Sequence, residues 1–157
     1  MGNDVRFPRL VADTLAGDTL VLPDTLDEGL AVVMLVFRRH AQSVVDSWMM
    51  PLRRRYHEHP RVAYYEVPML AGGWRMISGF IDGGMRSGVH PSLHGNVATY
   101  YGDSTRFREM LDIDDLDSAY AFLINGDGDV LYRGSGWATT RKLEGLYETV
   151  AAALGTT

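Results

Sequence analysis

The chain has 157 residues, a length that predicts one domain spanning residues 1–157 with room for a hydrophobic core. Hydrophobic residues make up 46% and charged residues 22%, as in an ordinary globular protein, which argues against disorder and against a membrane protein. The net charge of −5 argues against nucleic acid as a partner, and the absence of cysteine excludes thiol chemistry and thiolate metal sites.

No apolar run approaches the roughly 20 residues that a membrane-spanning helix needs, so we expect no membrane span. The first ten residues, MGNDVRFPRL, have neither the apolar core of a signal peptide nor the Arg/Ser-rich composition of a transit peptide. We therefore expect a soluble, cytoplasmic protein. A mitochondrial or other organellar location would require that a presequence has been removed.

The first half of the chain predicts strand, strand, helix, strand. Residues 18–22 form a short strand candidate, and the continuous apolar run 31–37 predicts a strand buried on both faces. Residues 42–57 predict an amphipathic helix and residues 61–67 a strand that ends at Pro68. The apolar stripe of that helix comprises Val44, Val45, Trp48, Met49, Leu52 and Tyr56, and we expect Trp48 and Met49 to lie in the core.

The middle of the chain gives weaker signals. Residues 73–86 predict a weak helix, because three glycines disfavour it, and residues 87–95 predict a loop. Residues 97–101 are a strand candidate, and residues 104–111 predict a short helix capped by Ser104.

The last third is clearer. Residues 120–124 and 129–132 predict two strands joined by NGDG, a strong turn signal because Asn and Gly accept positive φ. Residues 140–154 predict a final helix that Thr139 or Thr140 caps. Strand-helix alternation followed by a hairpin predicts an α/β fold, with a mixed central sheet and helices on both faces.

This order of elements resembles the thioredoxin-like superfamily over nearly the whole chain. The opening FPRLVADTLAGDTLVLPDTL is similar to the N-terminal extension of its peroxiredoxin and membrane-anchored thioredoxin-like branches. The resemblance implies a thioredoxin-like three-layer sandwich with an N-terminal strand extension.

Three segments are most similar to the mitochondrial ATP synthase assembly factors that attend the membrane-embedded proton-channel subunit. They are LVFRRHAQSVVDSWMMPL at 35–52, EVPML at 66–70 and AFLINGDGDVLYRGSGWAT at 121–139. The positions that carry the likeness are Gln42, Ser47, Trp48, Gly134, Gly136, Ala138 and Thr139.

The chain departs from redox-active relatives at both halves of their site. Those relatives place cysteine at the start of the first long helix, where this chain has Gln42 or Ser43 and Val45. They also place a cis-proline before the strand equivalent to 120–124, where this chain has Asp117-Ser118-Ala119. The resemblance therefore implies a protein that is neither a thiol-disulfide oxidoreductase nor a cysteine peroxidase.

A candidate partner-binding surface lies where the buried strand 31–37 passes into the helix 42–57. The basic residues Arg38, Arg39 and His40 separate the strand from the helix, and their side chains should project into solvent beside the helix N-terminus. There they could attract an acidic or carboxylate-bearing partner. Alternatively, their charges only solubilise the end of the strand. Trp137 joins this set because it lies in the Gly-rich segment GSGWATT, where glycine neighbours would not bury its indole. The predicted surface comprises Arg38, Arg39, His40, Gln42, Ser43 and Trp137.

The polar clusters of the chain admit metal or catalytic interpretations, but simpler ones are favoured. His90 and His94, like His57 and His59, lack a third ligand at metal-binding spacing, and we expect solvated histidines. The oxygen ligands of NGDGD lack the glycine order and final glutamate of a calcium loop, so we expect a hairpin turn. We predict no metal and no other cofactor.

Two classes of function follow. The first is a redox-inactive, chaperone-like or complex-assembly module that holds a protein or peptide client. The alternative is an enzyme of non-thiol chemistry that uses the first-helix N-terminus or the His90/His94 loop. A set of Ser43, His40 and Asp46 lies too close in sequence for a triad geometry to be assumed. The client and the oligomeric state stay open.

Overall fold

The computed structural model describes residues 5–70 and 95–155, apart from the side chain of Arg39. Within these residues, seven strands form one sheet in the order β2-β1-β5-β4-β3-β6-β7. The strands are β1 (Leu10–Thr14), β2 (Thr19–Leu22), β3 (Leu30–Val36), β4 (Val62–Leu70), β5 (Ala98–Tyr101), β6 (Ala119–Asn125) and β7 (Val130–Ser135).

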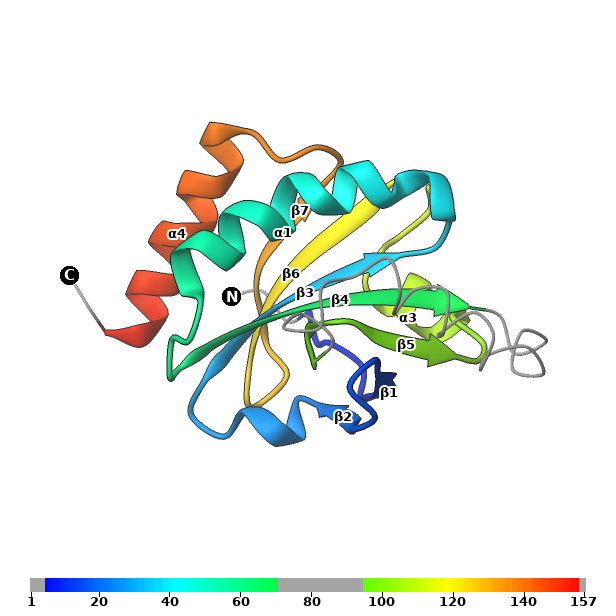
Figure 1. Ribbon diagram of the computed structural model, residues 1–157, viewed down its shortest axis with the longest axis horizontal. Coiled ribbons are helices and arrows are strands. Elements are labelled where there is room, and N and C mark those ends of the chain that lie inside the picture. The colour runs from blue at the N-terminus through cyan, green and yellow to red at the C-terminus, as the bar shows by residue number, and fades with distance from the viewer. Residues whose placement is uncertain (1–4, 71–94, 156–157) are drawn as a thin grey trace.

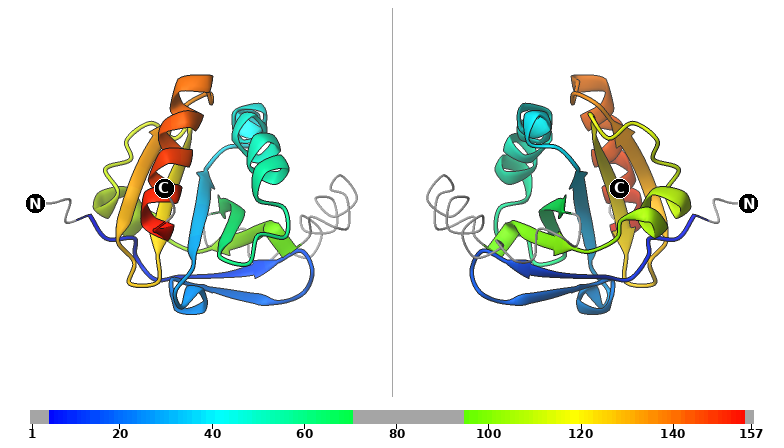
Figure 2. Two further views of the ribbon diagram at one scale, coloured as in Figure 1. Left: turned by 90° about the vertical axis from the view of Figure 1, so that its left-hand side faces the viewer. Right: turned by 90° about the vertical axis from the view of Figure 1, so that its right-hand side faces the viewer.

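Helices cover both faces of this sheet. Helices α1 (Gln42–Tyr56) and α4 (Thr140–Leu154) lie together on one face, as Figures 1 and 2 show. The short helix α3 (Thr105–Met110) lies on the other. The predicted α/β class, with a mixed sheet between two helical layers, is confirmed.

Strand β3 is the centre of the sheet, as its continuous apolar run predicted. It pairs in parallel with β4 and antiparallel with β6, and every one of its residues is buried. The hairpin β6-β7 adds an antiparallel edge strand. On the other side β5 continues the sheet in parallel with β4 and is followed by the antiparallel pair β1-β2.

Each face of the sheet has its own apolar core. On the α1 face, Val45, Trp48 and Leu52 are fully buried against alternate residues of β3, as the stripe predicted. Met49, expected in the core, and Val44 are only partly buried at the margin of this layer. Leu146 of α4 completes this layer. On the opposite face, Phe107 of α3 packs among the other alternate residues of β3 and the inward side chains of the N-terminal strands.

Three details differ from the sequence-based expectations. Strand β1 was not anticipated: only alternate residues, Leu10, Ala12 and Thr14, face inward, and their mixed polarity conceals the period-two pattern. The prediction that β4 ends at Pro68 is wrong. The strand continues to Leu70 because it pairs with β5 beyond the proline, at Met69 and Leu70.

The predicted cap of α3 is also wrong. Ser104 occupies the N-cap position but makes no side-chain cap hydrogen bond. The carboxylate of the preceding Asp103 instead accepts from the Thr105 backbone N at 2.9 Å and from its hydroxyl at 2.6 Å. At α4 the prediction holds, since the Thr139 hydroxyl accepts from the Lys142 backbone N at 3.2 Å.

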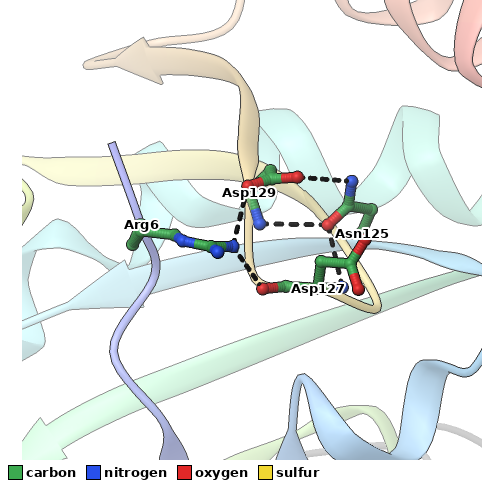
Figure 3. Close-up of polar contacts among 4 residues, drawn as sticks. All are labelled: Arg6, Asn125, Asp127 and Asp129. Atoms are coloured by element: carbon green, nitrogen blue, oxygen red, sulfur yellow. Dashed lines mark hydrogen bonds and ion pairs between the residues drawn. The ribbon is translucent and has the colours of Figure 1, made fainter. Parts of the chain in front are cut away.

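The NGDG turn is a hairpin connection whose polar atoms bond to one another (Figure 3). The Asn125 side-chain oxygen accepts from the backbone N of Asp127 and of Asp129, each at 3.0 Å. Arg6 then donates to the Asp127 carbonyl at 2.6 Å and to the Asp129 carboxylate at 2.8 Å. The side-chain oxygens of Asn125 and Asp129, two of the three residues considered as calcium ligands, therefore accept hydrogen bonds from within the turn and from Arg6.

The weak helix predicted at 73–86, and the loop residues His90 and His94, lie outside the described residues. Across the part of the chain that is described, no helix is long and apolar enough to cross a membrane.

Candidate functional site

The candidate site lies at the edge of the sheet where β3 ends. Val36, the last residue of β3, pairs with Pro68 of β4 on one side and with Ala119, the first residue of β6, on the other. The chain then passes through a short 3-10 turn, Arg39–Ala41, into α1. The end of β3, the start of β6 and the N-terminus of α1 therefore meet at one edge.

Two of the predicted basic residues, Arg38 and His40, contact one carboxylate oxygen at this edge. Asp117 Oδ1 lies 3.4 Å from Arg38 Nε and 3.2 Å from His40 Nε2. All three side chains are exposed, and we call Arg38, His40 and Asp117 the rim. The backbone N of Asp117 donates to the Asp115 carboxylate at 2.9 Å, which supports its position before β6.

Asp117 was not among the predicted site residues. Its only sequence signal was its place in Asp117-Ser118-Ala119, where redox-active relatives carry their proline. The pairing with Arg38 and His40 depends on β6 lying antiparallel to β3, which local sequence does not reveal.

The Gln42 side chain contacts Asp46 of α1 and Glu66 of β4. Its side-chain nitrogen donates to the Asp46 carboxylate at 3.1 Å, and its side chain also hydrogen-bonds to Glu66. Burial of Glu66 on β4 raises the pKa of its carboxyl, and the nearby Asp46 charge raises it further, against the opposing effect of the Gln42 hydrogen bond. The first turn of α1 thus lies over a carboxyl group that resists ionisation.

We expect Glu66→Gln to change how stability depends on pH. Because folding raises the pKa of Glu66 above its ordinary value of 4.5, the wild type should lose stability as the pH rises through the window that begins near that value. The variant should lack this loss. The stability of the variant relative to the wild type should therefore be greater at neutral pH than at pH 4. Urea unfolding from pH 4 to pH 8 measures the difference, with Glu109→Gln, an exposed glutamate of α3, as control. Parallel pH profiles for wild type and Glu66→Gln would contradict this interpretation.

Ser43 lies exposed in the first turn of α1. The two residues considered as its triad partners bond elsewhere: His40 contacts Asp117, and Asp46 accepts from Gln42. A Ser-His-Asp arrangement is therefore not assembled among these described side chains.

The segment that carries Trp137 is held by hydrogen bonds from three elements. We call residues 136–139 the Trp137 loop. The indole nitrogen of Trp48, in α1, donates to the Gly136 carbonyl at 2.7 Å, and the Gly136 N donates to the Ala119 carbonyl of β6 at 3.0 Å. Lys142 Nζ of α4 donates to the Trp137 carbonyl at 3.0 Å.

Ser47 completes these restraints from inside α1. Its hydroxyl accepts from the Ala138 backbone N at 2.9 Å and donates to the Val44 carbonyl at 2.6 Å. The Trp137 side chain is nevertheless 58% exposed. The backbone of the loop is held in place while its largest side chain faces solvent.

Two glycines permit this arrangement. A Cβ on Gly134 would lie 2.6 Å from Cη2 of Trp48, so only glycine leaves room for the buried indole. Gly136 has φ +70°, a left-handed conformation that favours glycine. Two segments that the sequence comparison singled out separately therefore contact each other. They contribute Ser47 and Trp48 from α1, and Gly134, Gly136 and Ala138 from the end of β7 and the Trp137 loop.

The other histidines considered in sequence lie past the C-terminal end of α1. His59 Nδ1 accepts from the Arg61 backbone N at 3.0 Å, and His57 Nδ1 lies 3.8 Å from the Glu58 carboxylate. Within residues 5–70 and 95–155, no group of three or more His, Cys, Asp or Glu side chains is placed to hold a metal ion.

Comparison with solved structures establishes the fold. A putative thiol:disulfide interchange protein from Chlorobium tepidum aligns with TM-score 0.62 at 16% identity, covering 99% of each chain. The thioredoxin domain of a Bacteroides vulgatus thiol-disulfide oxidoreductase aligns with TM-score 0.65 at 13% identity, covering 96% of this chain and 99% of that one. An uncharacterised conserved protein from Geobacillus kaustophilus gives TM-score 0.64 at 14% identity, with 96% and 82% coverage.

The fold is therefore thioredoxin-like, and the sequence contains no cysteine. Residues 3–152 match the family described as ATP10 protein. The chain belongs to this family, that of the ATP synthase assembly factors. No curated protein sequence matches it.

Proposed function

We propose that this chain is a redox-inactive, protein-binding module that acts in the assembly of a protein complex, with an ATP synthase subunit or assembly intermediate as its client. The family supports the assembly role, because residues 3–152 match ATP10 protein. The lack of cysteine leaves the fold without the nucleophile on which thiol-disulfide exchange depends.

The observation that supports this proposal most strongly is that Trp137 is exposed to solvent on a loop whose backbone is held by hydrogen bonds. Exposed indoles are strong binding anchors, since Trp buries a large area and loses little conformational entropy on binding. The surrounding backbone is already restrained by Trp48, Ser47 and Lys142, so a partner would not have to order the loop on binding. The predicted surface around the end of β3 supplies charged groups beside this anchor.

We expect Trp137→Ala to lower client affinity by about 2 kcal/mol, roughly 30-fold, as for a binding hot spot. Tagged wild type and variant, expressed at matched levels in native cells, would be captured in mild detergent and their co-purifying proteins quantified by mass spectrometry. Wild type should retain ATP synthase components, and Trp137→Ala should lose most of them.

Met110→Ala is the matched control, because Met110 is also an exposed apolar residue, 40% accessible, but belongs to α3. Both substitutions should change the free energy of unfolding by about 0.5 kcal/mol or less. Equal recovery of ATP synthase components by wild type and Trp137→Ala would show that the loop is not the binding surface. Recovery of none by wild type would contradict the assembly role.

A further inference from the structure

The rim already shows how this surface holds a carboxylate. Asp117 places one carboxylate oxygen between the guanidinium of Arg38, at 3.4 Å, and the imidazole of His40, at 3.2 Å. Exposed ion pairs of this kind contribute little to stability, because water and salt compete for both partners. A carboxylate from another molecule could therefore replace that of Asp117 at small cost.

Asp117 of the rim and the Trp137 loop lie next to the paired strands β6 and β7, just before the start of β6 and just after the end of β7. Gly136 N donates to the carbonyl of Ala119, two residues beyond Asp117. The Ser118 hydroxyl lies 4.0 Å from the position that a Cβ on Gly136 would take. Trp137 and Asp117 each lie one residue from this contact, so one extended segment of a partner is long enough to span the Trp137 loop and the rim.

We propose that the partner segment carries an Asp or Glu side chain close to a large apolar one, and that its carboxylate displaces Asp117 between Arg38 and His40 while the apolar side chain packs on Trp137. This inference rests on the proposed function and specifies the chemistry of the client at the same surface. Asp117 is then an intramolecular competitor, which contacts Arg38 and His40 until a partner with a better-placed carboxylate binds.

Charge complementarity selects this occupant. The rim contains one permanent cation, Arg38, and one imidazole, His40, which is charged only when protonated. Displacement of Asp117 leaves both of these groups facing the incoming side-chain carboxylate. Arginine binds carboxylates with directional hydrogen bonds, which favours a planar acid over a neutral amide of equal size.

A peptide selection tests the proposal without knowledge of the client. A phage library of random ten-residue peptides would be selected on the wild-type protein and depleted on Trp137→Ala. The enriched peptides should combine an aromatic or large aliphatic residue with Asp or Glu within about three positions, as an extended segment requires. The most enriched peptide, labelled with fluorescein, and its Asn or Gln counterpart would then be titrated by fluorescence anisotropy.

Three affinity changes are expected. The amide counterpart should bind about tenfold more weakly to wild type, and Arg38→Gln should weaken binding of the acidic peptide to a similar extent. Asp117→Asn should tighten binding of the acidic peptide about threefold, because the competing carboxylate is gone. The control Asp114→Asn removes a nearby exposed negative charge outside the rim and should change the affinity much less.

Weaker or unchanged binding by Asp117→Asn would overturn the competitor role and indicate that Asp117 only orients Arg38 and His40. Enriched peptides that need Trp137 but contain no acid would overturn the acidic partner and leave the proposed function standing. If no enriched peptide binds wild type better than Trp137→Ala, the inference is wrong, because it requires the partner to pack on Trp137. The capture of ATP synthase components would then decide the proposed function separately.

Discussion

Replacement of Trp48 by alanine is expected to lower the free energy of unfolding by about 3–5 kcal/mol, as for other buried aromatic residues. The Trp48 side chain is completely buried in the layer between α1 and the sheet, so its removal would leave a cavity there. It would also leave the Gly136 carbonyl without its indole donor. Urea unfolding followed by circular dichroism would measure the loss.

Trp48→Phe separates packing from hydrogen bonding. It keeps most of the apolar volume but removes the N–H, so it should cost less than the alanine variant. In both variants the Ala138 amide, which Ser47 restrains, should exchange its hydrogen faster than in the wild type. Unchanged exchange at Ala138 in Trp48→Ala would show that the Trp137 loop is held independently of the indole.

Gly134→Val is expected to destabilise the protein by about 1–3 kcal/mol through overpacking. The new Cβ would lie 2.6 Å from Cη2 of Trp48 and 3.2 Å from the Tyr132 ring. Because Trp48 is fully buried, its indole cannot move aside without disturbing α1 or the Trp137 loop. Thermal and urea unfolding would give the change.

Gly145→Ala provides the contrasting control. Gly145 lies inside α4, and a Cβ there would make an ordinary contact of 3.6 Å with the Tyr132 ring. Alanine should therefore stabilise α4 by about 0.5–1 kcal/mol through its higher helix propensity. A double mutant of Gly134→Val with Trp48→Phe should cost less than the sum of the two single changes, because the smaller ring relieves the clash. If the free-energy changes of the two single mutants are strictly additive, the strain in Gly134→Val does not arise from contact with Trp48.

The residues that carry the family likeness near Trp48 are joined to one another by hydrogen bonds. Ser47 and Trp48 bond to residues 91 and 88 positions further along the chain. Their joint effect is to position the Trp137 loop beside the start of β6. This is the sheet edge at which the candidate surface lies, so the buried Trp48 and the partly buried Ser47 help to shape the surface that we propose binds a partner.

The sequence by itself determined the elements whose signals are local. The apolar run of β3, the helical stripe of α1 and the NGDG turn each depend on neighbours within a few residues, and each prediction is confirmed. The absence of cysteine likewise excluded thiol chemistry without any structure. The extent of β4 could not be determined in the same way, because pairing with β5 carries it through Pro68.

Tertiary structure alone decided what the predicted surface contains. Arg38 and His40 were identified from the chain, but Asp117 reaches them only because β6 runs antiparallel to β3. Gln42 was expected beside them, and the parallel pairing of β3 with β4 instead places Glu66 beneath it. Strand pairing joins residues that are distant in sequence, and the energy of those contacts leaves no periodic trace in the chain. The composition of the surface therefore follows from the register of the sheet.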